Sequence, residues 1–182
     1  MPIKIEDELK KLPEDFVVLT IVPSESYNEI NSKILNFLTK KGKGTYITVN
    51  KPYSTLIKNF KKSKGLKLDN LYFIDCITKE LQGSCVGKNC SFIESPQDLT
   101  GVAVALDSIF KKESHEFIYI DSLDTLSVYN DMNKLIKFFH FLTGKIKLHN
   151  LSGVIIGIHE DTDKVLISKL TQFCDKTIDL TQ

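Results

Sequence analysis

The stretch Phe16-Val17-Val18-Leu19-Thr20-Ile21-Val22 is apolar at all positions but one and rich in β-branched residues. A continuous apolar run of this kind is typical of a strand that is covered on both faces of a parallel sheet. Five similar runs follow, at residues 45–49, 71–75, 116–121, 153–158 and 176–180. Segments with helical spacing of apolar residues separate most of them. The alternation predicts an α/β protein with right-handed crossovers and a mainly parallel sheet.

The helical segments are placed by their apolar spacing and by the residues at their ends. A helix over residues 30–38 runs into a glycine- and lysine-rich stretch, where Gly42 is predicted to form a left-handed cap. Asp98 is the predicted N-cap of another helix. Further helices are predicted at residues 135–148 and 163–173, after a long loop at residues 77–91. The whole chain, 1–182, is expected to form one domain, with residues 1–15 as a helical lead-in.

The composition limits the possible functions. All basic residues are lysine, and the 24 lysines are balanced by 23 acidic residues, giving a net charge of +1. The chain therefore supplies no arginine finger and no bidentate guanidinium clamp. The near-neutral charge does not favour a nucleic-acid or membrane partner. Apolar runs stay far below the roughly 20 residues that cross a bilayer, and no apolar signal region begins the sequence, so we expect no membrane insertion and a cytoplasmic location.

The loop after the first strand is where an open parallel sheet would bind a ligand. A nucleotide-binding loop would read Gly-x-x-x-x-Gly-Lys-Ser/Thr, because glycine amides approach the phosphates and lysine contacts the terminal phosphate. This chain reads Pro23-Ser24-Glu25-Ser26-Tyr27-Asn28-Glu29. Pro23 lacks an amide hydrogen, and two glutamates would repel phosphate. The stretch predicts a helix start capped by Ser24 or Ser26, with a retained anion site as the alternative.

A second candidate position is the acid that ends the run Ile118-Tyr119-Ile120-Asp121. This is the form of a Walker B element, in which the aspartate orients magnesium through water. By itself the pattern is weak, because a strand-end aspartate more often caps the turn that follows it.

Several short motifs, taken in order and spacing, carry a resemblance that spans about residues 16–180. They are Ser95-Pro96-Gln97-Asp98-Leu99-Thr100, Ile118-Tyr119-Ile120-Asp121-Ser122-Leu123-Asp124-Thr125-Leu126, Tyr129-Asn130-Asp131, Phe138-Phe139-His140-Phe141-Leu142-Thr143 and Phe173-Cys174-Asp175-Lys176. Together they resemble the archaeal KaiC-like branch of the RecA ATPase superfamily. The resemblance implies a three-layer αβα, RecA-like domain, with Asp121 at the Walker B position and a nucleotide crevice between residues 23–28 and Asp121.

The chain departs from that family at the parts needed for phosphoryl transfer. The phosphate loop is replaced, and Asn50-Lys51-Pro52-Tyr53 stands where KaiC-like ATPases usually carry glutamates that position the attacking water. With arginine also absent, we expect a degenerate relative that has no catalytic residues and no cofactor. We expect a binding or regulatory module that contacts a protein partner or associates with itself. The superfamily usually assembles side by side.

Two other functions remain open from the sequence. A nucleotide, ATP or ADP with magnesium, could be retained through Ser24, Ser26, Asn28 and Asp121. Alternatively, the lysines at 40, 41, 43, 58, 61, 62, 64 and 67 could contact nucleic-acid phosphates, although a solvated helix face explains them as well and no arginine is present to read guanine.

The cysteines are candidate metal ligands. Four residues separate Cys85 from Cys90, with Cys76 nearby, and no second pair follows. This spacing lies at the margin of zinc sites, so we predict thiols without a metal.

Overall fold

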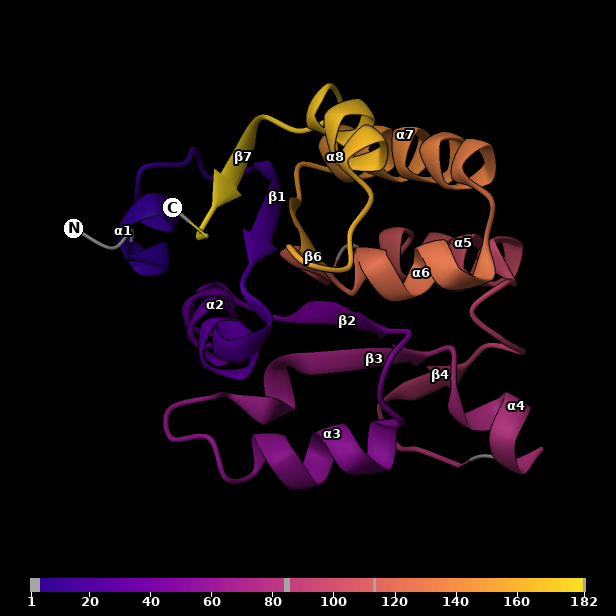
Figure 1. The fold of residues 1–182 in the computed structure, drawn as a ribbon. Helices are drawn as coiled ribbons and strands as arrows, with labels where there is room; N and C mark the ends of the chain where they lie inside the picture. Colours follow the sequence, from indigo (N-terminus) through magenta and orange to yellow (C-terminus); the bar gives the residue numbers. More distant parts are fainter. Residues whose placement is uncertain (1–3, 84–85, 113, 182) are drawn as a thin grey trace.

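The protein is described here from a computed structural model, in residues 4–83, 86–112 and 114–181. One seven-stranded sheet has the order β4-β3-β2-β5-β6-β1-β7, and every described strand pair in it is parallel (Figure 1). The strands are β1 (Val17–Val22), β2 (Gly44–Thr48), β3 (Leu71–Asp75), β4 (Cys90–Phe92), β5 (Phe117–Asp121), β6 (Ser152–Ile158) and β7 (Lys176–Asp179). The predicted α/β class with a parallel sheet is confirmed.

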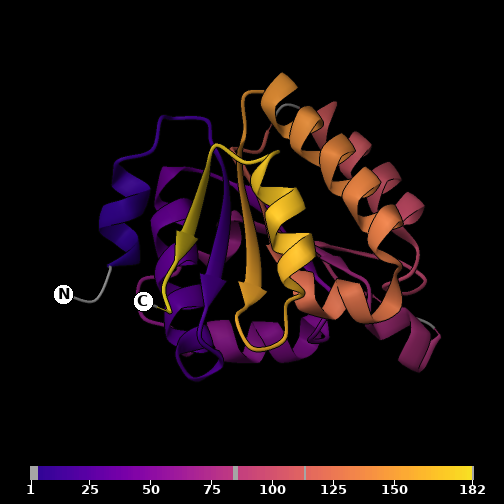
Figure 2. The same ribbon diagram turned by 45° about the horizontal axis from the view of Figure 1, so that its top comes forward.

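Helices pack on both faces of the sheet and complete the three-layer, RecA-like arrangement (Figure 2). One layer contains α1 (Ile5–Lys10), α2 (Tyr27–Lys41) and α3 (Tyr53–Phe60), and the other contains α5 (Leu99–Phe110), α6 (Leu123–Tyr129), α7 (Met132–Leu148) and α8 (Lys164–Thr171). The short α4 (Thr78–Gln82) follows β3, and two 3₁₀ turns, η1 (Ser24–Ser26) and η2 (Leu68–Asn70), precede α2 and β3. No helix among the described residues has both the length and the apolar character that a membrane span requires.

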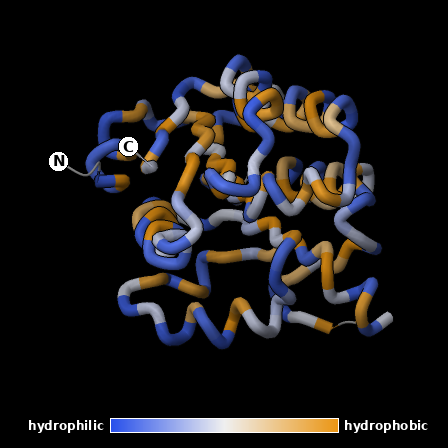
Figure 3. Tube along the Cα trace, viewed as in Figure 1, coloured by the Kyte–Doolittle hydropathy of each residue, from blue (hydrophilic) through white to orange (hydrophobic). Residues whose placement is uncertain are grey.

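Two hydrophobic cores lie on the two faces of the sheet, because successive strand residues point to opposite sides. Val17, Leu19 and Ile21 of β1 face the α5–α8 layer, whereas Val18 and Val22 face the α1–α3 layer. The whole of β1 is buried, as its continuous apolar run predicts. Figure 3 shows apolar positions along the strands and polar positions on the outer turns of the helices.

The six strands predicted from apolar runs are each found within one residue at either end. The predicted loop at residues 77–91 is wrong in part, because it includes α4 and reaches β4. Strand β4 is only three residues long, lies at the sheet edge and is partly exposed throughout, so it has no apolar run. The predicted left-handed cap at Gly42 is also wrong. Its φ is 179°, so the backbone is extended there, although its amide still donates to the Leu38 carbonyl.

The strand order creates a switch point between β2 and β5. These strands are neighbours, with Thr48 paired to Asp121 at their carboxyl ends. The helix that follows β2 packs on one face of the sheet, and the helix that follows β5 packs on the other. Ligands of open α/β sheets bind in such crevices, which makes the surroundings of Asp121 the first place to search for a site.

Candidate functional site

The loop after β1 forms one 3₁₀ turn that leads directly into α2. Neither Ser24 nor Ser26 makes a side-chain cap hydrogen bond, so the predicted serine cap is wrong. The reason is local: Ser26 has φ −97° and ψ −3°, whereas a capping residue needs extended backbone. The amide of Ser24 instead donates to Oε2 of Glu160 at 3.2 Å. The Glu160 carboxylate therefore accepts a hydrogen bond from a backbone amide that, in a phosphate loop, would donate to the ligand.

Asp121 lies at the end of β5 and is fully buried. Its Oδ2 accepts a short hydrogen bond from the Tyr46 hydroxyl, while its Oδ1 has no partner among the described residues. Burial raises the pKa of the Asp121 carboxyl, and the hydroxyls of Tyr27 and Tyr46 oppose that rise only in part. The aspartate does not cap the following turn, and it is not presented to solvent as a magnesium site would be.

Tyr27 closes the space between the β1 loop and Asp121. This first residue of α2 is buried, and its hydroxyl interacts with the Asp121 carboxyl. The Nζ of Lys51 lies 5.1 Å from the centroid of the Tyr27 ring and reaches Asn28 Oδ1 at 3.4 Å. The crevice expected behind residues 23–28 is therefore filled by an aromatic side chain.

A buried chain of hydrogen bonds connects α2 with Asp121. The Nδ2 of Asn31 donates to the hydroxyls of Tyr27 at 3.1 Å and of Tyr46 at 3.3 Å, and Tyr46 in turn donates to Asp121. Burial is the main cause that raises the pKa of both tyrosines, with the Asp121 charge adding to it. Both hydroxyls therefore remain protonated donors.

The four sequence-predicted ligand residues do not form one cluster. Ser24 and Asn28 are exposed, Ser26 is partly buried and Asp121 is fully buried. No hydrogen bond between described residues joins Asp121 directly to any of the other three. Lys51 provides the electrostatic link, because it contacts Asn28 and lowers the pKa of Asp121.

The residues that organise this region were not among the predicted ligands. They are Tyr27, Asn31, Tyr46 and Lys51. One signal was available: Tyr27 and Asn31 are four residues apart, which places both on the same face of a helix. No local pattern pairs Tyr46 with Asp121, because that contact depends on the neighbouring positions of β2 and β5.

The acid at the end of β3 has a structural role. Asp75 is fully buried and accepts hydrogen bonds from the amides of Tyr53 at 2.7 Å and of Ile77 and Thr78 at 2.8 Å. It also accepts from the Thr78 hydroxyl. These donors fix the turn between β3 and α4 and the start of α3, so the carboxylate is already saturated.

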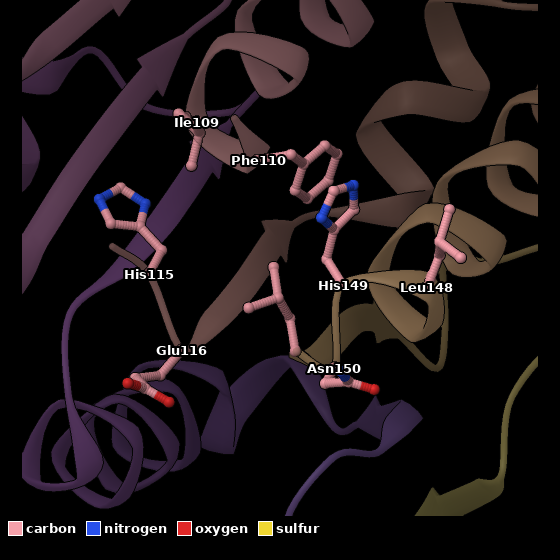
Figure 4. A pocket seen from close by; sticks show the side chains of 8 residues that line it. Ile109, Phe110, His115, Glu116, Leu148, His149 and Asn150 are labelled. Atoms are coloured by element: carbon pink, nitrogen blue, oxygen red, sulfur yellow. The ribbon is translucent and has the colours of Figure 1, made fainter. Parts of the chain in front are cut away.

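A separate cavity of about 380 Å³ lies at the opposite, amino-terminal edge of the sheet (Figure 4). His115 and His149 line it but are engaged elsewhere. The Nδ1 of His115 is 2.8 Å from the Thr45 hydroxyl, and the His149 ring stacks on Phe110 at a centroid distance of 4.8 Å. Burial and two nearby lysines lower the pKa of His115. The two rings serve packing and do not converge on a shared ligand position.

The cysteines give no metal centre in the described part of the chain, where no three histidine, cysteine or acidic side chains are grouped to hold an ion. Cys76 is buried, and burial raises the pKa of its thiol. Cys85, the partner proposed for Cys90 in a marginal zinc pair, lies outside the described residues.

The region around Asp121 is thus defined by the neighbouring positions of β2 and β5 and by the buried side chain of Tyr27. The fold is a RecA-like arrangement, and the loop after β1, Asp121 and Lys51 make contacts within the chain. Comparisons of the sequence with protein-family models and with curated proteins find no match.

Proposed function

We propose that this protein is a non-hydrolysing RecA-like module, similar to KaiC-like ATPases, which acts through protein contacts. The observation that carries the proposal is the burial of Tyr27 at the start of α2, where its hydroxyl accepts from Asn31 and lies close enough to Asp121 for their charges to interact. The amide of Ser24, which would face a phosphate, donates to Glu160. ATP hydrolysis needs free amides and a carboxylate that can orient magnesium, whereas here the Ser24 amide bonds Glu160 and Asp121 is buried.

The first prediction concerns nucleotides. Purified protein with millimolar ATP or ADP and magnesium is expected to show no saturable rise in melting temperature and no phosphate release. Ligand that binds only the folded state must stabilise it, so a thermal-shift titration detects binding without assuming activity. A saturable stabilisation that Asp121→Asn abolishes would support the alternative, in which ATP or ADP is held through Ser24, Ser26, Asn28 and Asp121.

The exposed apolar side chains favour one layer as the contact surface. Large apolar residues with substantial exposure occur on α5 to α8 at Val104, Val128, Phe141, Leu148 and Val165. None of the described residues of α1 to α3 belongs to that group. These five residues lie on four helices of one layer, whereas the exposed large apolar residues outside that layer, Leu81 and Val86, lie on α4 and in the segment after it. We therefore assign the contact to the α5–α8 layer, with a second copy of this chain as the partner.

The second prediction tests that assignment by light scattering coupled to gel filtration. The chain is expected to self-associate in a concentration-dependent manner, and the double variant Val104→Lys, Phe141→Lys is expected to be monomeric at the same concentration. Charged residues at the centre of an apolar contact are strongly unfavourable. The matched control is the double variant Ser54→Lys, Thr55→Lys, which adds the same two charges at exposed positions on α3. A wild-type chain that is monomeric throughout would contradict self-association.

A further inference from the structure

A second cavity lies between α2 and α3, beside the buried Asn31, Tyr46 and Asp121 chain. Its volume is about 390 Å³. Its polar lining consists of Asn28, Asn31, Ser32, Lys51, Asn59 and Ser63. Leu56 and Phe60, both buried, supply an apolar surface. The lining is mostly polar, which suits a ligand rich in hydroxyl groups, and the two apolar residues offer a surface for a ring.

The charged residues in and around the cavity indicate which charge a ligand would carry. Lys51 is the one charged side chain among the described residues that line it. The neighbouring lysines Lys58, Lys61, Lys62 and Lys64, at the end of α3 and just beyond it, form no ion pair in the described structure. The region is therefore positive without a balancing carboxylate in the lining. An anionic ligand is favoured, and an amine or a metal ion is not.

Asn31 provides an independent sign that a polar ligand group belongs here. Its side chain lines the cavity and is only 6 % exposed. Its Nδ2 donates to Tyr27 and Tyr46, but its Oδ1 has no partner. Buried polar atoms are nearly always paired, because an unpaired one has lost its water without replacement. The atom has no accessible surface in this arrangement, so a ligand hydroxyl would pair with it only after the Asn31 side chain turns toward the cavity.

We propose that this cavity binds a small phosphorylated sugar. The Lys51 ammonium would pair with the phosphate, the amides of Asn28, Asn31 and Asn59 would bond the sugar hydroxyls, and Phe60 would pack against the ring. The volume lies at the low end for ligand sites, which suits a sugar phosphate better than a nucleoside triphosphate with its magnesium. This site shares Asn28 with the stretch after β1 but lies between α2 and α3, and it does not depend on self-association.

A ligand in the cavity would also affect Asp121, because hydrogen bonds connect Asn31 to Asp121 through Tyr46. Asn31 donates to the Tyr46 hydroxyl, and Tyr46 donates to Asp121 at the β2/β5 switch point. The chain has no tryptophan and six tyrosines, so its intrinsic fluorescence comes from tyrosine. A ligand bound against Asn31 therefore changes the surroundings of Tyr27 and Tyr46, and tyrosine emission reports it.

The test is calorimetric titration of the full chain with ribose 5-phosphate and glucose 6-phosphate, with tyrosine emission as a second readout. At least one of them is expected to bind saturably, and at least tenfold more tightly than ribose, glucose or inorganic phosphate. Lys51→Met is expected to weaken binding at least tenfold, because a charge-assisted hydrogen bond is lost. Asn59→Leu, at an exposed position that should not impair folding, is also expected to weaken it.

The matched control is Lys58→Met, which removes the same charge from α3 at a position that does not line the cavity. Its affinity should equal that of the unmodified chain. The proposal is overturned if neither sugar phosphate binds at millimolar concentration, or if inorganic phosphate binds equally tightly. It is also overturned if Lys58→Met weakens binding as much as Lys51→Met does, since the lysines would then act only as a general positive surface.

Discussion

Tyr46→Ala is expected to lower the free energy of unfolding by about 3–5 kcal/mol, the cost of removing a large buried aromatic side chain. The Tyr46 ring is fully buried and stacks on Tyr119 at a centroid distance of 5.1 Å. It also packs edge-on against Phe60, at a centroid distance of 5.6 Å, and in a tilted arrangement against Phe73 at 5.7 Å. Alanine would leave a cavity between three strands and α3. Urea unfolding followed by far-UV circular dichroism measures the loss.

The conservative variant Tyr46→Phe separates the ring from the hydroxyl. Phenylalanine keeps the packing but leaves Asp121 Oδ2 and Asn31 Nδ2 without this partner. Its expected cost is about 1–3 kcal/mol, the range for stranding a buried polar group. Equal losses for the two variants would contradict the packing role, and no loss for Tyr46→Phe would contradict the hydrogen-bond role. Tyr72→Phe, at a partly buried tyrosine that bonds Ser91, is the control.

The strands were predictable because they are buried on both faces. Residues 16–22, apart from Thr20, and residues 117–120 are continuously apolar, which favours strands covered on both faces, and both stretches form strands in the sheet. The edge strand β4 had no such signal, because Cys90, Ser91 and Phe92 are each partly exposed. The short α4 was missed for a related reason, since only Thr78 of it is buried. The helices α3 and α6 were also not predicted, although each places apolar residues in a core.

The candidate site was less predictable than the fold, because its contacts join distant residues. Asp121 was identified from its place at the end of an apolar run, but its burial was not, since the covering residue comes from α2. The hydrogen bond from Tyr46 spans 75 residues and exists only because β2 and β5 are neighbours. Ser24 and Ser26 failed as caps because η1 continues directly into α2, a backbone detail that residue type does not specify.

The same burial gives Asp121 an unusual influence on the pH dependence of stability. Its pKa is raised in the folded protein, mainly by burial. The folded state therefore binds this proton more tightly than the unfolded chain, whose carboxyl titrates near its ordinary value of about 3.9. Above the raised pKa the buried charge destabilises the fold. As the pH falls through that pKa toward about 4, the carboxyl becomes neutral and its contribution to stability rises.

Asp121→Asn is accordingly expected to unfold at a higher urea concentration than the unmodified chain at pH 7–8, by about 1–3 kcal/mol. The amide oxygen can still accept from Tyr46. The advantage should shrink toward zero at about pH 4, since the aspartate is then neutral as well. Other carboxyls, such as Glu8 with its pKa lowered to about 2 beside Lys11 and Lys176, titrate in both proteins and cancel from the difference. The difference in unfolding free energy between the two proteins could instead stay constant from pH 8 to pH 4. In that case the Asp121 charge does not destabilise the fold, and the basis for its coupling to Tyr46 and Asn31 is removed.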